Sequence, residues 1–235
     1  MRLVGGAERA GRPGAGGRRH AVRAGDGDGE GDSDEGDEDE SLLVVRRASV
    51  VFFHADVTKA SVLRLVSLLH AAAVCALRAQ ASPLSPQRVM LYIHSDGGDA
   101  HAGLSAMAHT AHCALFVVAI ADGFVASAAT LLLLGAHERY ALPHANVLLH
   151  QVRADCSGKM QDVRDNVANA ELVTEALVAS YRERTLMSEQ DIRRLLRREL
   201  WLTPEQCVRW GIVSAVLVRP PPWVLAAPGA PRLGA

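Results

Sequence analysis

Val89-Met-Leu-Tyr-Ile-His94, followed at once by Ser95-Asp-Gly-Gly98, is the stretch that decides the fold. An apolar run of this length indicates a buried strand, and the paired glycines indicate a turn at its end. A helix is expected directly afterwards, from about Ala100 to His112. The stretch therefore predicts one strand-and-helix unit of an α/β fold.

The same alternation continues on both sides of this unit. We expect further strands at 50–53, 115–120 and 147–150, and further helices at 58–77, about 123–134 and 159–183. Repeated units of this kind predict a mainly parallel sheet. With 4% aromatic residues, the core must be built from Leu, Val, Ala and Ile, which suits helices packed on parallel strands.

Composition divides the 235 residues into three parts. Residues 1–40 hold 11 acids and 6 arginines but almost no large apolar side chain, so we expect a disordered acidic, Gly/Arg-rich tail. Residues 220–235 are rich in proline and alanine and form a second tail. The folded domain is expected to span 41–219. It is only mildly basic, which argues against nucleic-acid binding.

Targeting signals and cysteine spacing bear on the compartment. No short apolar stretch typical of a signal peptide begins the chain, and we expect a cytoplasmic location.

Segment 113–136 carries one charge and is long enough to span a bilayer, but Asp122-Gly123 interrupts it, so we interpret it as a buried strand and helix. Neither a disulfide framework nor a zinc motif is suggested by the four cysteines, which are widely spaced: Cys75, Cys113, Cys156 and Cys207.

Three features together suggest acyl-transfer chemistry: Ser127 at the start of an apolar helix, His150 at the end of a strand, and the Gly97-Gly98 turn. Each feature alone is weak, because a serine at a helix start is usually a cap. Nucleophilic catalysis needs a hydroxyl, an imidazole that takes its proton, and fixed N–H groups for the oxyanion. The sequence offers all three.

At this point a family resemblance emerges. Leu91-Tyr-Ile-His-Ser-Asp-Gly-Gly98 resembles the strand and Ser-Pro-Gly-Gly turn of the proteolytic subunit of the Clp protease. Gly123-Phe-Val-Ala-Ser127-Ala-Ala129 resembles the Gly-x-Ala-Ala-Ser-Met-Gly segment of that family. Similar segments follow in the family's order at 139–143, 147–151 and 202–213, so the resemblance covers about residues 45–218. It implies a crotonase-like α/β fold with a protruding handle helix.

The resemblance implies a role for each matching residue. Ser127 would be the nucleophile of a serine endopeptidase, His150 its general base, and the N–H groups of Gly98 and Ala128 the oxyanion hole, with Gly97 shaping the turn. The substrates would be peptides or unfolded proteins, the assembly a homo-oligomer of stacked heptameric rings, and no cofactor would be needed. The acidic tail replaces the family's axial-pore segment, which argues against partnership with a Clp-type ATPase.

Two departures from the family pattern concern the catalytic machinery. Leu195 occupies the position where the third triad residue, an aspartate, is expected. Glu199, one helical turn later, is a candidate third acid, although a solvated charge is its simpler interpretation; Asp191 lies one turn earlier. Asp96 replaces the proline of the turn and brings a carboxylate near the oxyanion hole.

Two alternative functions remain open. A catalytically weak or inactive ring subunit is suggested by Leu195 and Asp96. A crotonase-like acyl-CoA lyase or hydratase shares the fold and the Gly-Gly turn. A metal site is not expected, because His94, His101 and His144 lack helical i, i+4 spacing and an accompanying carboxylate cluster.

Overall fold

The computed structural model describes residues 44–47, 49–78 and 88–219. The two tails expected from composition, 1–40 and 220–235, lie outside the described residues. The strands are β1 (Val44–Arg47), β2 (Val50–Phe53), β3 (Arg88–Ser95), β4 (Phe116–Ala126), β5 (Glu138–Ala141), β6 (Asn146–Leu148), β7 (Trp201–Leu202) and β8 (Ala215–Val216). The helices are α1 (Lys59–Arg78), α2 (Ala100–Ala111), α3 (Ala129–Gly135), α4 (Met160–Arg184), α5 (Glu189–Leu196) and α6 (Pro204–Arg209).

The described strands form one sheet in the order β1-β2-β3-β4-β5-β8, with β6 beside β4 and β7 beside β6. Strands β2, β3, β4, β5 and β8 run parallel, whereas the β1–β2 and β6–β7 pairs are antiparallel. The predicted α/β architecture with a mainly parallel sheet is therefore confirmed.

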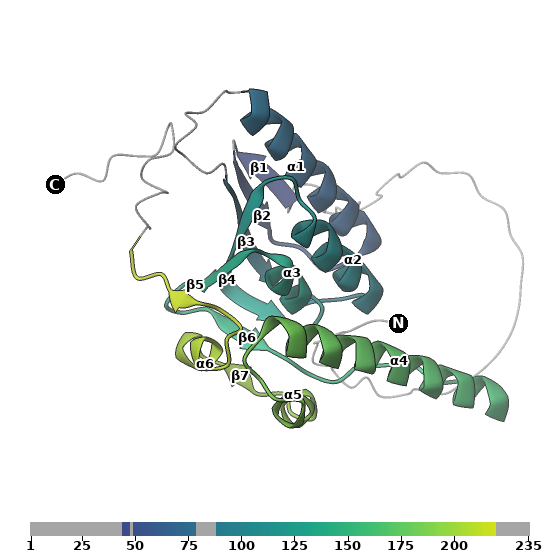
Figure 1. Ribbon diagram of the computed structural model, residues 1–235. Helices are drawn as coiled ribbons and strands as arrows, with labels where there is room; N and C mark the ends of the chain where they lie inside the picture. Colours follow the sequence, from purple (N-terminus) through teal and green to yellow (C-terminus); the bar gives the residue numbers. More distant parts are fainter. Residues whose placement is uncertain (1–43, 48, 79–87, 220–235) are drawn as a thin grey trace, which may run out of the picture.

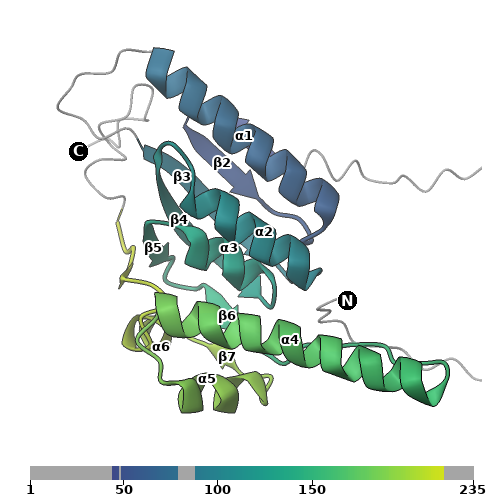
Figure 2. The same cartoon turned by 45° about the vertical axis from the view of Figure 1, so that its right-hand side comes forward.

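Helices α1, α2 and α3 cover one face of this sheet (Figures 1 and 2). The burial of alternate residues in β3 shows which face of the sheet the helices cover. Val89, Leu91 and Ile93 have no exposed surface and belong to the main core, whereas Met90 on the opposite face belongs to a smaller cluster with Val118 and Ile120. Side chains alternate between the two faces of a strand, so the main core lies between β3 and the three helices.

Strand β4 is longer than the sequence suggested. The expected turn at Asp122-Gly123 and the helix from about 123 are both wrong, because the strand continues to Ala126 and α3 begins only at Ala129. Gly123 has a φ of 96°, and a Cβ there would lie 2.4 Å from Nδ1 of His94. The glycine thus bends the strand against His94 without ending it. Beyond the bend, β4 pairs with β6.

Helix α4 has 25 residues and projects beyond the body of the molecule (Figure 1). Its buried side chains all lie in the second half, from Val173 to Tyr181. In the part that projects, Val167 is exposed. The predicted protruding handle helix is therefore present. Among the described helices, none is both long enough and apolar enough to span a lipid bilayer.

Candidate active site

Ser127 lies in the tight turn between β4 and α3. Its φ is 57°, the left-handed region that non-glycine residues rarely adopt. Its amide donates to the carbonyl oxygen of Leu148 at 2.8 Å, and its own carbonyl accepts from the amide and the hydroxyl of Thr130 at 3.1 and 2.6 Å. Three hydrogen bonds therefore hold the strained backbone in place, as strained residues at functional sites require.

His150 lies at the same edge of the sheet, because β6 runs parallel to β4. Ala126 is paired with Leu148, so Ser127 and His150 follow the carboxyl ends of two neighbouring strands. His150 is buried, with 4% of its surface exposed. Burial lowers the pKa of His150, Arg153 lowers that pKa further, and Glu199 partly opposes both. The neutral form, which can accept a proton, is therefore favoured.

The serine and histidine side chains do not form a hydrogen bond with each other in the structure. Oγ of Ser127 and both ring nitrogens of His150 are buried, and none of them forms a well-aligned hydrogen bond with a described residue, although the backbone of Gln151 lies close enough to raise the pKa of His150. Buried polar groups without partners are unusual and call for an explanation. The structure thus places Ser127 and His150 after two paired strand ends, with no hydrogen bond between their side chains.

The glycine turn packs directly against Ser127. Gly97 has a φ of 101°, and a Cβ there would lie 2.5 Å from Cβ of Ser127 and 3.1 Å from the amide nitrogen of Ala128. Gly98 forms a β-bridge with Val57. In this bridge the Val57 amide donates to the carbonyl of Gly97, and the Asp99 amide donates to the carbonyl of Val57, so the bridge does not use the amide of Gly98. The backbone of Gly97 therefore packs closely against Ser127 and the amide of Ala128.

None of the candidates for the third triad residue is free to pair with His150 in the described structure. Oε1 of Glu199 lies 2.7 Å from Nη2 of Arg153, a pair that lowers the pKa of Glu199. Asp191 accepts hydrogen bonds from Ser188 and Arg194. Leu195, at the position expected for the triad aspartate, packs partly buried against the core. Every candidate carboxylate on this segment is thus engaged elsewhere or absent.

Asp96, the residue in place of proline, is exposed. It therefore faces solvent, and no ion pair is formed by its carboxylate within the described part of the chain.

Two interactions at the site were missed by sequence reasoning. Arg153 lies three residues after His150, but its pairing with Glu199 spans 46 positions and leaves no local signal. Thr130 joins Ser127 to Tyr181 of α4, again across a long separation.

Of the three histidines considered as metal ligands, His94 has another partner. Nδ1 of His94 lies 2.9 Å from the carbonyl oxygen of Asp122, whose carboxylate pairs with His54 at 3.2 Å. Within the described ranges, no group of three His, Cys, Asp or Glu side chains is arranged to hold a metal ion. The expected lack of a metal or cofactor stays a prediction.

Comparisons with known proteins identify the family and the fold of the chain. The family model described as Clp protease matches residues 42–220. The chain is 33% identical over 130 residues to an ATP-dependent Clp protease proteolytic subunit of Nephroselmis olivacea, covering 54% of this chain and 62% of that protein. It is 34% identical over 131 residues to the ATP-dependent Clp protease proteolytic subunit 1 of Streptomyces avermitilis, covering 55% and 60%. The chain thus spans less than two thirds of either relative.

A solved structure shows the same fold. A ClpP1 mutant from Listeria monocytogenes superposes with a TM-score of 0.63 at 19% sequence identity, covering 73% of this chain and 92% of that one. The fold class and the family resemblance drawn from the sequence motifs are both confirmed.

Proposed function

The chain belongs to the Clp protease family, and on that premise we propose that it is a serine-type endopeptidase with Ser127 as nucleophile and His150 as general base. The observation that carries the proposal is the turn at Ser127. The proposal is supported by the left-handed backbone of Ser127, the hydrogen bond from its amide to Leu148, and the parallel pairing of β4 with β6, after which Ser127 and His150 follow.

The reaction follows from the parts of the site. The neutral imidazole of His150 takes the proton of the Ser127 hydroxyl as the oxygen attacks a peptide carbonyl. The developing oxyanion accepts hydrogen bonds from the amides of Gly98 and Ala128, and the imidazolium then protonates the leaving amine. The Oγ of Ser127 and the ring nitrogens of His150 are not committed to other hydrogen bonds within the described residues, which leaves them available for this role.

Substrate, assembly and compartment belong to the proposal as well. Peptides or unfolded proteins would be the substrates, and copies of the chain would assemble into stacked heptameric rings. The relatives named above are ATP-dependent, whereas the acidic residues 1–40 argue against docking of a Clp-type ATPase. The cytoplasmic location stays a prediction.

A catalytically weak ring subunit is the second candidate. Leu195 supplies no carboxylate, Glu199 is held by Arg153, and neither ring nitrogen of His150 forms a well-aligned hydrogen bond with a described residue. A serine protease whose histidine lacks its orienting acid loses a factor of roughly 10⁴ in rate, although the oxyanion hole and binding retain about 10³ over water.

The test is labelling of the purified protein with a fluorophosphonate probe, with the adduct located by peptide mass spectrometry. Ser127→Ala and His150→Ala serve as controls, and native mass spectrometry reports the assembly. Labelling at Ser127 that His150→Ala abolishes supports the peptidase. Absence of labelling in folded, ring-assembled protein would reject it in favour of the weak subunit. Acyl-CoA binding without labelling would favour the crotonase-like alternative.

A further inference from the structure

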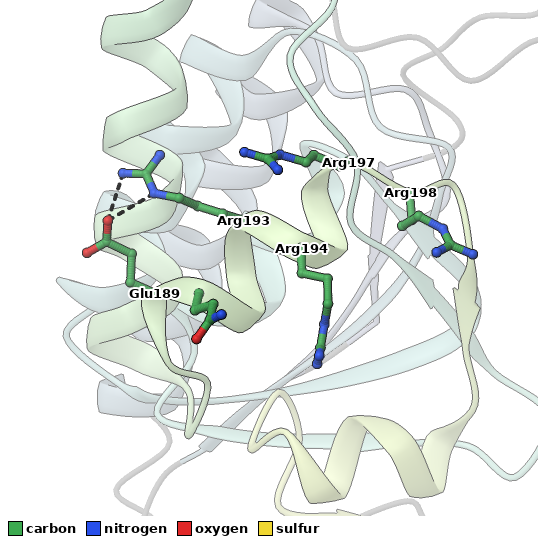
Figure 3. A pocket seen from close by; sticks show the side chains of 6 residues that line it. Glu189, Arg193, Arg194, Arg197 and Arg198 are labelled. Carbon is green, nitrogen blue, oxygen red and sulfur yellow. Dashed lines mark hydrogen bonds and ion pairs between the residues drawn. The ribbon is translucent and has the colours of Figure 1, made fainter.

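The C-terminal end of α5 carries a concentration of positive charge. Arg193, Arg194, Arg197 and Arg198, here called the arginine patch, line a surface hollow of about 690 Å³ together with Glu189 and Gln190 (Figure 3). Four guanidinium groups within six residues repel one another unless anions lie close to them.

Only part of this charge is neutralised within the described chain. Arg193 pairs with Glu175 and Glu189, and Arg194 pairs with Asp191 at 2.8 Å. Arg197 and Arg198 are exposed, and neither forms an ion pair with another residue of the described ranges. In Figure 3 the Arg198 side chain is directed away from the carboxylate of Glu189, whereas the Arg197 side chain extends toward the side on which Arg193 lies. The patch therefore has room and charge for an acidic ligand.

An acidic ligand of matching character is present in the same chain. Residues 26–40 read Asp-Gly-Asp-Gly-Glu-Gly-Asp-Ser-Asp-Glu-Gly-Asp-Glu-Asp-Glu, ten acids with no basic residue. We propose that this segment, residues 26–40, docks on the arginine patch of its own chain, with its carboxylates facing Arg197 and Arg198.

The length of the connection allows this contact. Residue 26 precedes Val44, the first residue of β1, by 18 positions, which correspond to about 60 Å of extended chain. A folded domain of this size is roughly 40 Å across, from its expected radius of gyration. The far part of the acidic segment can therefore reach α5 from the opposite edge of the sheet.

Charge pairing explains why this segment is the occupant. Guanidinium groups bind carboxylates through paired hydrogen bonds, and a tethered ligand binds at the effective concentration set by its linker. The contact concerns binding alone, so it goes beyond the proposed catalytic function and does not depend on it.

The experiment uses the full chain with the photoreactive residue p-benzoylphenylalanine placed at the exposed position of Gln190. After irradiation at low salt, mass spectrometry maps the cross-linked peptide. The expected result is an adduct within residues 26–40 that falls about tenfold in 0.5 M NaCl and about tenfold in the double variant Arg197→Glu/Arg198→Glu.

A matched control separates the patch from the net charge. The double variant Arg164→Glu/Arg219→Glu changes the net charge by the same amount as the patch variant. Both arginines are exposed; Arg164 lies in the projecting half of α4, and Arg219 is the last described residue. This control variant should keep the adduct. The milder Arg197→Gln/Arg198→Gln pair should lose part of it, and circular dichroism checks that all variants fold.

Several outcomes would overturn the proposal. These are an adduct that lies outside 26–40, an adduct that is insensitive to the patch variant, and equal loss in the control pair. In a mixture of ¹⁴N and ¹⁵N copies, an adduct formed only between copies would equally reject a contact within one chain. A preference of the patch for added nucleic acid, seen as displacement of the adduct by a short DNA duplex but not by a synthetic 26–40 peptide, would do the same.

Discussion

Glu199 Oε1 lies 2.7 Å from Nη2 of Arg153, so the one candidate acid beside His150 is held by a cation. His150 experiences both partners: Arg153 lowers the pKa of His150, and Glu199 raises it. The two charges thus act on the imidazole in opposite directions.

Arg153→Gln and Glu199→Gln should therefore shift the pH dependence of Ser127 labelling in opposite directions. Removal of the cation raises the pKa of His150, so the neutral base appears only at higher pH and the acidic limb moves upward. Removal of the carboxylate lowers that pKa, and the limb moves downward. The rate of fluorophosphonate labelling between pH 5 and 8 measures both shifts.

The control for this pair is Arg164→Gln, which removes an exposed positive charge from α4. It should leave the limb in place. Shifts of the same sign in both site variants would contradict the assignment of the two charges.

Leu195→Asp should accelerate labelling of Ser127 by about tenfold or more, because a carboxylate at the position of the family's acid can orient the imidazole of His150. Leu195 is partly buried against the core, so a thermal melt must accompany the rate. Leu195→Asn has the same shape without the charge and should give little acceleration. Equal rates for both variants would show that position 195 does not reach the histidine.

Much of this fold was predictable from local sequence. The apolar run of β3 is bounded by Gly97-Gly98, and α2 follows at once, so strand, turn and helix all have local signals. The error at Asp122-Gly123 has a physical reason. This dipeptide usually ends a strand, but residues 124–126 find a partner in β6, about twenty positions later, and the strand continues.

In the site, too, the residues with local sequence signals could be predicted and the contacts between distant residues could not. Ser127 and His150 could be proposed from local motifs, because each stands at the end of an apolar run. The Arg153–Glu199 and Thr130–Tyr181 contacts join residues 46 and 51 positions apart, and no local pattern contains such pairs.

Gly97→Ala should disrupt both the fold and the site. A Cβ at this position would lie 2.5 Å from Cβ of Ser127 and 2.8 Å from the carbonyl oxygen of Ala126, in a backbone with φ of 101°. Strain and overlap together should lower the free energy of unfolding by more than about 2 kcal/mol and abolish labelling of Ser127. Urea denaturation and probe labelling measure the two effects.

The matched control is Gly158→Ala. Gly158 also has a positive φ, 115°, but the three atoms nearest to a Cβ there all belong to the Asp162 side chain, with Oδ2 at 2.9 Å, and the end of that side chain can move. The loss should be about 1 kcal/mol with labelling retained. If the two substitutions have the same effect on labelling, the close approach of the glycine turn to Ser127 is not what the site requires.

Tyr181→Phe should test the connection between the long helix and Ser127. The Thr130 hydroxyl donates to the Ser127 carbonyl at 2.6 Å, so its contact with Tyr181 must use the phenolic proton. Loss of this hydrogen bond should cost about 1 kcal/mol of unfolding free energy at pH 7.

The same substitution makes a pH prediction with a definite sign. Burial raises the pKa of Tyr181 to about 12 from its usual value near 10. The unfolded chain therefore releases this proton first, and the stability that the phenol contributes is complete below pH 10 and is lost as pH rises toward 12. Burial also raises the pKa of Cys207 to about 12, but this thiol is present in both the wild type and Tyr181→Phe, so its contribution cancels from the stability difference between them.

Urea denaturation at pH 7 and at pH 11 should show the stability difference between wild type and Tyr181→Phe shrinking at the higher pH, because only the wild type loses the phenol contribution. A difference that stays constant would mean that the phenol is not buried in the folded protein.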